Sequence, residues 1–271
     1  MTGSDGLLEN AAYTERYARH LVLKEIGGAG QQKLSAACVL VIGAGGLGAS
    51  LLAYLAAAGV GSISIIDDDV VSLSNLQRQV LFNHDDIGLP KAICAAKFLA
   101  RLNPDCKVTP IDARLTADNA QNLIEAHDII ADGCDNFTTR FLVNDACYFA
   151  GKPLVSAAVG RFDGQLTTFK AYENDAKGTP YPCYRSFVSD DMRASEATDC
   201  ETTGIIGVTP TASLTLHYSN DRLINLFYNV EKSGFISTSD FDVKNALEIS
   251  YVDSKYNDDY KVVGVGETFF D

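Results

Sequence analysis

A glycine-rich turn between a short apolar run and a long helical run constrains this chain more than any other stretch. The apolar run, residues 39–42, is typical of a buried parallel strand, and the helical pattern continues from the turn to Ala58 and ends at Gly59. The turn itself consists of Gly43, Ala44, Gly45, Gly46, Leu47 and Gly48. Glycines let a backbone turn tightly and approach a polyphosphate, whose oxygens the N–H groups of a helix start bind. The stretch predicts a nucleotide site without assigning a reaction.

A second apolar run, residues 62–66, predicts the next strand and leads directly into Asp67, Asp68 and Asp69. In nucleotide-binding α/β units, a carboxylate at the carboxyl end of this strand accepts hydrogen bonds from the hydroxyls of a ribose. These aspartates therefore predict the ribose end of the site.

Three polar side chains follow the ribose carboxylate. Asn75 and Arg78 lie three residues apart and so share one face of a helical turn, and Lys91 follows Gly88-Leu89-Pro90 in a first helical turn. A dinucleotide dehydrogenase does not need two cations and an amide at this place, because the helix start already holds its pyrophosphate. The pattern favours a triphosphate.

Composition bounds the class of protein. With 271 residues and 46% hydrophobic residues, the chain is expected to form one large α/β domain. The net charge of −13 argues against bulk contact with nucleic acid or an anionic membrane, and no apolar run reaches the length of a membrane span. The first ten residues lack a signal-peptide pattern, and the seven scattered cysteines favour reduced thiols in a cytoplasmic protein.

The segments around the nucleotide stretch alternate between helices and strands. Helices are predicted at 14–26, 92–102, 116–126 and 137–150, with strands at 107–111 and 127–132. Strands at 154–159 and 166–171 flank a turn and predict a switch to antiparallel pairing. The expected fold is a doubly wound, Rossmann-like α/β fold: a mostly parallel sheet with some antiparallel strands and helices on both faces.

Asp135 follows the predicted strand 127–132, at the end where ligand crevices form in open α/β sheets. It fits two roles, either a ligand-binding carboxylate or the N-cap of the helix 137–150, and the two are compatible.

The later part of the chain divides by composition. Residues 173–203 are polar and predict a long mobile loop that carries Cys183 and Cys200. One helix is expected after Pro210, and 231–271 reads as short strands and turns. The predicted organisation is a single domain with N-terminal helices (1–36), a nucleotide-binding core (37–172), the loop (173–203) and a C-terminal part (204–271).

The residues permit chemistry at a nucleotide phosphate. The four histidines form no pairing typical of a metal site or of a nucleophile with its base. A carboxylate that attacks the α-phosphate of ATP needs no general base, because it is already ionised at pH 7. Catalysis would then consist of positioning and charge stabilisation by Arg, Lys and a carboxylate-held Mg²⁺.

A set of motifs in this order closely resembles the MoeB/ThiF family, the bacterial relatives of ubiquitin-activating enzymes. The resemblance covers residues 13–207. Its motifs are Gly43-x-Gly45-Gly46-x-Gly48, Asp67-x-Asp69, Ser72-Leu73-Ser74-Asn75-Leu76-Gln77-Arg78-Gln79, Gly88-x-Pro90-Lys91, Asp132-x-x-Asp135-Asn136 and Gly164-Gln165. The resemblance implies an adenylyltransferase, commonly a homodimer, that uses ATP and Mg²⁺ to adenylate the C-terminal Gly-Gly of a small ubiquitin-fold sulfur-carrier protein.

The resemblance also implies roles for single residues. Asn75, Arg78 and Lys91 would contact the phosphates, and Asp135 would hold Mg²⁺. Arg19 matches an arginine that the family inserts into the partner subunit's site. Without the resemblance, Arg16 and Arg19 would be interpreted as solvated surface residues. The residues implied to form the ATP-binding set are Gly43, Gly45, Gly46, Asp67, Asp69, Asn75 and Gln79.

Cys183 and Cys200 bear on how closely the chain follows the family's pattern. Many members bind a structural zinc through two Cys-x-x-Cys pairs, but here the first reads Cys183-Tyr184-Arg185-Ser186 and no cysteine follows Cys200, so no zinc site is expected. Cys200 aligns with a loop cysteine that links covalently to the carrier in some members. It is either such a thiol or an incidental exposed cysteine.

Several other functions remain open from the sequence. A relative with the same fold could activate another carboxylate or a modified tRNA base, although the acidic charge disfavours tRNA. The glycine motif also permits an NAD-dependent oxidoreductase, against which Arg78, Lys91 and Asp135 argue. A non-catalytic binding module is the remaining alternative.

Overall fold

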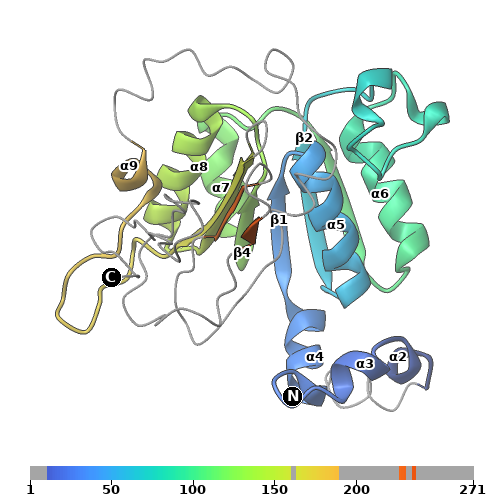
Figure 1. Cartoon of the computed structure of the whole chain (residues 1–271), viewed down its shortest axis with the longest axis horizontal. Coiled ribbons are helices and arrows are strands. Elements are labelled where there is room, and N and C mark those ends of the chain that lie inside the picture. Colours follow the sequence, from blue (N-terminus) through green and yellow to red (C-terminus); the bar gives the residue numbers. More distant parts are fainter. Residues whose placement is uncertain (1–10, 160–162, 189–225, 230–233, 236–271) are drawn as a thin grey trace.

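An eight-stranded sheet in the order β3-β2-β1-β4-β5-β6-β7-β8 organises the computed structural model, which describes residues 11–159, 163–188, 226–229 and 234–235 (Figure 1). The first five strands in this order pair in parallel and the last three pair antiparallel. The strands are β1 Cys38–Ile42, β2 Ser62–Asp67, β3 Lys107–Asp112, β4 Ile129–Asp132, β5 Leu154–Val159, β6 Asp163–Phe169, β7 Leu226–Asn229 and β8 Gly234–Phe235. The predicted antiparallel switch after β5 is confirmed.

Helices cover both faces of this sheet (Figure 1). α5 (Gly46–Ala58) and α6 (Lys91–Leu102) pack on one face, and α7 (Ala117–Glu125) and α8 (Phe137–Ala150) on the other. Side chains alternate along a strand, so Val39 and Val41 of β1 join the core under α5 and α6, while Leu40 and Ile42 join the core under α7 and α8. The doubly wound α/β fold is therefore confirmed.

The predicted single helix at 14–26 is wrong. The structure has two short helices, α2 (Ala11–Arg16) and α3 (Ala18–Leu21), and after a turn a third, α4 (Gly27–Ala36), which pattern reasoning missed. α4 begins with Gly-Gly, a poor helix-forming sequence, and tertiary contacts decide its conformation instead. Tyr17, between α2 and α3, is buried and its hydroxyl accepts a hydrogen bond from Asn103 Nδ2 at 2.8 Å.

These N-terminal helices lie at the amino end of β1 (Figure 1). They hold the end of α5: Gln31 Nε2 donates to the carbonyl oxygen of Ala58 at 2.9 Å, and Gly59 ends the helix in the left-handed conformation, with φ 85°. The contact leaves no room for a side chain at Gly59, since a Cβ there would lie 2.6 Å from the Tyr17 hydroxyl.

The first part of the stretch predicted as a loop is anchored on α8. A short helix, α9 (Tyr184–Phe187), receives two contacts from α8: Asn144 Oδ1 accepts from the N–H of Tyr184 at 2.8 Å, and Asp145 pairs with Arg185. The rest of that stretch, the helix expected after Pro210 and most of the C-terminal part lie outside the described residues. No helix in the described ranges is long and apolar enough to cross a membrane.

Replacing Gly48 with alanine should destabilise the fold. A Cβ on Gly48 would lie 1.9 Å from the carbonyl oxygen of Gly43, so the backbone of the turn would have to move. We expect the free energy of unfolding, measured in urea, to fall by about 2 kcal/mol.

Gly45→Ala is the matched control: apart from its chain neighbours and its own helix, the one described heavy atom within 4 Å of the added Cβ would be Gln79 Nε2, at 3.9 Å. Its unfolding free energy should stay within about 1 kcal/mol of wild type. Equal stability of the Gly48 variant and wild type would show that the glycine turn is not packed as described.

Candidate functional site

Two turns, each joining a strand to a helix, meet at the carboxyl ends of the neighbouring strands β1 and β4. The N–H of Gly133 donates to Ile42 O at 3.0 Å, which ties the second turn to the end of β1. Gly43 has a φ of +88°, and a Cβ there would lie 3.2 Å from Gly133 O. The chain leaves β1 toward β2 and leaves β4 toward β5, in opposite directions, so this is the switch point where open α/β sheets bind ligands.

No described side chain caps the start of α5. Gly45 is its N-cap, so the first N–H groups of the helix are available to an anion. Gln79 Nε2 is the one described heavy atom within 4 Å of the point where a Gly45 Cβ would lie, apart from its chain neighbours and its own helix. The geometry fits the predicted phosphate cradle.

Asp67, the last residue of β2, holds the glycine turn in place. Its carboxylate accepts hydrogen bonds from the N–H groups of Ala44, at 2.7 Å, and Asp69, at 2.9 Å. Burial raises the pKa of Asp67 above its usual value, and the two N–H groups partly offset that effect. Asp67 thus lies beside the predicted cradle, as expected for the ribose carboxylate.

Lys91 reaches the same edge of the sheet as the first residue of α6. Its ammonium pairs with Asp69 at 2.8 Å, and its N–H donates to the carbonyl oxygen of Asp69 at 2.9 Å. The Lys91 side chain is only 7% exposed, whereas that of Asp69 is 69% exposed. Asp69 therefore holds a nearly buried cation next to the Asp67 carboxylate.

The segment 72–79 folds on itself beside the cradle. A 3-10 turn, η1 (Leu73–Asn75), is capped by Asn75, whose buried side-chain oxygen accepts from Ser72 N at 3.2 Å. Arg78 is half-buried and donates to Ser74 O at 2.9 Å, and Gln79 is buried. The side-chain oxygen of Asn75 thus serves as a structural cap, which the sequence alone did not indicate.

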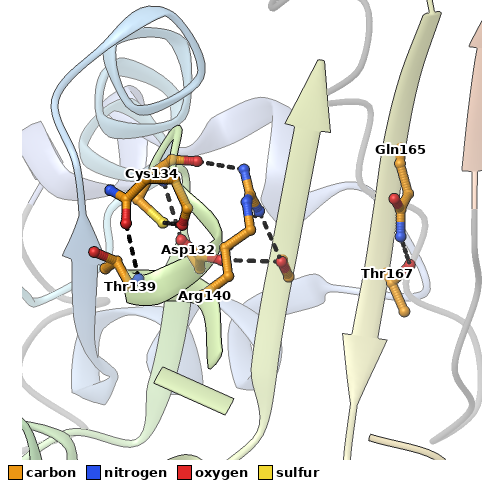
Figure 2. Close-up of polar contacts among 8 residues, drawn as sticks. Asp132, Cys134, Thr139, Arg140, Gln165 and Thr167 are labelled. Atoms are coloured by element: carbon orange, nitrogen blue, oxygen red, sulfur yellow. Dashed lines mark hydrogen bonds and ion pairs between the residues drawn. The ribbon is translucent and has the colours of Figure 1, made fainter. Parts of the chain in front are cut away.

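A buried ion pair supports the second turn from below (Figure 2). Asp132, the last residue of β4, accepts from Arg140 Nη1 at 3.2 Å and from Ser156 Oγ at 3.0 Å, and its other oxygen accepts from Cys134 N at 3.0 Å. Arg140 Nη2 also donates to the carbonyl oxygen of Cys134. Burial and the neighbouring Asp132 raise the pKa of the Cys134 thiol well above its usual value, so this cysteine stays protonated.

Asp135 lies exposed on this second turn, and Asn136 rather than Asp135 is the N-cap of α8. Asn136 Oδ1 accepts from the N–H of Thr139 at 2.8 Å, so the capping role considered for Asp135 is wrong. Since the cap is provided by its neighbour, the Asp135 carboxylate has no structural duty at the helix start.

Sequence reasoning missed Arg140 and Ser156. Arg140 lies one helical turn after the Asn136 cap, and Asp132 ends the preceding strand. This spacing was the signal that could have indicated an ion pair between the two. On its own it could not be told from a surface arginine.

Two residues of the predicted set lie apart from this cluster. Arg19 is exposed on α3, at the opposite end of the sheet from the two turns (Figure 1). Cys200 lies outside the described residues. The described part of the chain holds no group of three His, Cys, Asp or Glu side chains arranged for a metal ion.

Comparison with known proteins identifies the family. The model of the ThiF family matches residues 17–217. The chain belongs to the ThiF family. Among curated proteins, it is 45% identical over 201 residues to the SAMP-activating enzyme E1 of Haloferax volcanii, covering 74% of this chain and 72% of that one. It is 43% identical over 196 residues to the sulfur carrier protein adenylyltransferase of Thermus thermophilus, covering 72% of each.

A solved structure extends the comparison to a nucleotide complex. The tRNA N6-threonylcarbamoyladenosine dehydratase TcdA of E. coli, in complex with ATP, is 29% identical, with a TM-score of 0.50. The match covers 54% of this ThiF-family chain and spans 60% of that structure's length. The family and the enzyme class expected from the sequence are confirmed by these relatives.

Arg140→Ala should destabilise this ThiF-family protein strongly. It would leave the Asp132 carboxylate buried without its cation, at a cost of about 3–5 kcal/mol in unfolding free energy. Arg101→Ala, which removes an exposed arginine from α6, is the control and should change stability by less than about 0.5 kcal/mol. If urea unfolding gives similar values for both variants, the buried pair does not support the turn.

Proposed function

We propose that this protein adenylates the C-terminal Gly-Gly carboxylate of a small ubiquitin-fold sulfur-carrier protein, using ATP and Mg²⁺ and releasing pyrophosphate. One observation carries the proposal. Three features lie together at the carboxyl ends of neighbouring strands: the uncapped start of α5 after β1, the Lys91–Asp69 pair after β2 and the exposed Asp135 after β4. The names of the curated relatives, a SAMP-activating enzyme and a sulfur carrier protein adenylyltransferase, support the substrate class.

The chemistry follows from the charges of the site. The carrier's terminal carboxylate is ionised at pH 7 and attacks the α-phosphorus without a general base, as pyrophosphate leaves. The N–H groups at the start of α5 bind phosphate oxygens, and Arg78 and Lys91 stabilise the charge that builds up on them. Asp135 is the exposed carboxylate that would hold Mg²⁺, whose charge neutralises the leaving pyrophosphate.

A modified tRNA base is the second candidate substrate, because the solved structure that resembles this chain is a tRNA-modifying dehydratase. The net charge of −13 weighs against binding a polyanion such as tRNA. An NAD-dependent oxidoreductase is disfavoured by the cations at positions 78 and 91, which dinucleotide chemistry does not need.

Other features of the protein are part of the same proposal. The chain acts as a single domain in the cytoplasm, in keeping with six free cysteines in its described part. It needs no structural zinc, since Ser186 stands where a second ligand would be and α9 is held by Asn144 and Asp145 instead. Cys200 keeps its two alternatives, a thiol that links to the carrier or a bystander.

ATP–pyrophosphate exchange that depends on a Gly-Gly-ended carrier tests the reaction. Asp135→Ala and Arg78→Ala should each lower exchange about a hundredfold, since a lost preorganised charge partner costs on the order of 3 kcal/mol in the transition state. Asp118→Ala, an exposed carboxylate in the first turn of α7, is the control and should exchange like wild type. Exchange stimulated by tRNA but not by the carrier would support the second candidate, and full activity of Asp135→Ala would sink the adenylation site.

Mixing two inactive variants tests the proposed homodimer. Arg19 lies at the far end of the sheet from its own site, so in a shared site it would serve the partner subunit. Arg19→Ala and Asp135→Ala should each be inactive alone. After subunit exchange, about one quarter of all sites should combine an intact arginine with an intact aspartate. An active enzyme that sediments as a monomer, or no recovery on mixing, would refute the shared site.

A further inference from the structure

One buried polar atom beside the phosphate cradle has no partner. Gln79 is 3% exposed, and among the described residues its Oε1 is the one buried side-chain nitrogen or oxygen that makes no hydrogen bond. Buried polar groups in folded proteins are almost always hydrogen-bonded, because losing water without a replacement is costly. An orphan acceptor next to a ligand site therefore points to a donor that arrives with the ligand.

The backbone fixes where this acceptor lies. The N–H of Gln79 donates to Asn75 O at 2.9 Å and its carbonyl oxygen accepts from Phe82 N at 3.1 Å, so the residue is held firmly in its segment. Its Nε2 lies 3.9 Å from the place where a Cβ on Gly45 would be. The Nε2 end of the amide thus lies beside the start of α5, where the proposed function places the phosphates.

ATP alone does not satisfy this amide. A glutamine amide has one donor end and one acceptor end, and phosphate oxygens only accept. A phosphate can therefore pair with Nε2 but not with Oε1. The ribose hydroxyls belong beside Asp67 and the adenine amino group lies further from the phosphates, so neither supplies a donor at the start of α5. Arg78 donates to Ser74 O and Lys91 pairs with Asp69, and in the proposed reaction their remaining donors serve the phosphates.

The second substrate brings a suitable donor. In a protein C-terminus, the last backbone nitrogen lies about 2.5 Å from the carboxyl carbon, since only the Cα separates them. An attacking carboxylate therefore carries an N–H into the same space as the phosphate it attacks. A terminal glycine lacks a Cβ and so approaches a crowded backbone most easily.

We propose that Gln79 Oε1 accepts the backbone N–H of the terminal glycine of the incoming carrier and thereby orients its carboxylate for attack. The proposal rests on the adenylation function proposed above and specifies how the acceptor is recognised. Because an amide N–H is required, the site favours a peptide-linked carboxylate over a free small acid. Orientation of this kind lowers the barrier by fixing the reacting atoms in an attack geometry.

The test pairs an enzyme variant with a carrier variant. Gln79→Met has a similar length but no acceptor, and the probe is a semi-synthetic ubiquitin-fold carrier ending in Gly-Gly, made also with glycolate as its last residue so that an ester oxygen replaces the N–H. With wild type, the ester carrier should lose about 10- to 50-fold in kcat/KM for pyrophosphate release. With the natural carrier, the kcat/KM of Gln79→Met should be lower than that of wild type by a similar factor. In Gln79→Met, changing from the natural to the ester carrier should lower kcat/KM by less than a further factor of about three.

A further readout separates this role from a structural one. Turnover is compared at saturating ATP, because the substitution also removes the Nε2 donor that can meet a phosphate. Gln79→Met should unfold at the same or a higher temperature, because the orphan acceptor is gone. Gln77→Met, an exposed neighbour, is the control and should retain both carrier turnover and the penalty for the ester.

Two results would overturn the proposal. If wild type turns over the amide and ester carriers equally, the N–H is not recognised, and this result requires no variant to fold. If the penalty for the ester is undiminished in Gln79→Met, another group reads the N–H. In each case adenylation by wild type would leave the proposed function intact, whereas its absence would defeat both.

Discussion

The close contact between the two turns at the ends of β1 and β4 is the constraint on which the rest of the site depends. Gly48 must lack a Cβ because the carbonyl oxygen of Gly43 occupies that place, and Gly43 in turn packs against the carbonyl of Gly133. The contact sets where α5 begins and hence where its N–H groups lie. It also places the Asp135 turn against the glycine turn, so one packing arrangement positions both the start of α5 and the carboxylate proposed to hold Mg²⁺.

The buried pair of Asp132 and Arg140 explains how the second turn keeps its shape. Burying two charges costs about as much as their attraction returns, so the pair is weak evidence for stability. Its value lies in geometry: Asp132 holds the N–H of Cys134 and Arg140 holds its carbonyl oxygen, which fixes both ends of one peptide segment. A hydrophobic replacement could fill the same volume, but it could not orient the backbone that carries Asp135.

The sequence predicted those features that follow from local pattern. Apolar periodicity, with glycines where elements end, predicts the strand–turn–helix unit at residues 39–59, the helix α8 and the antiparallel turn after β5. Features set by distant contacts were not predictable. α4 begins with two glycines and is held by distant partners: its Gln31 donates to Ala58 O, and its Ser35 bonds to the Tyr13 hydroxyl. Nothing local marks Arg140 as buried. The orphan acceptor of Gln79 is likewise a property of the packed structure, because it depends on which partners the fold fails to supply.

Carboxylates outnumber cations among the residues of the proposed site. Lys91 pairs with Asp69 and lies near Asp67, and the proposed set adds one further cation, Arg78, and one further carboxylate, Asp135. Such a site does not attract a polyphosphate by its own charge. In the proposed function Mg²⁺ would offset this negative charge, and a further cation from another molecule would add to its effect. The exposed Arg19 on α3, far from its own site, is the cation that a second copy of the chain would contribute in the proposed homodimer.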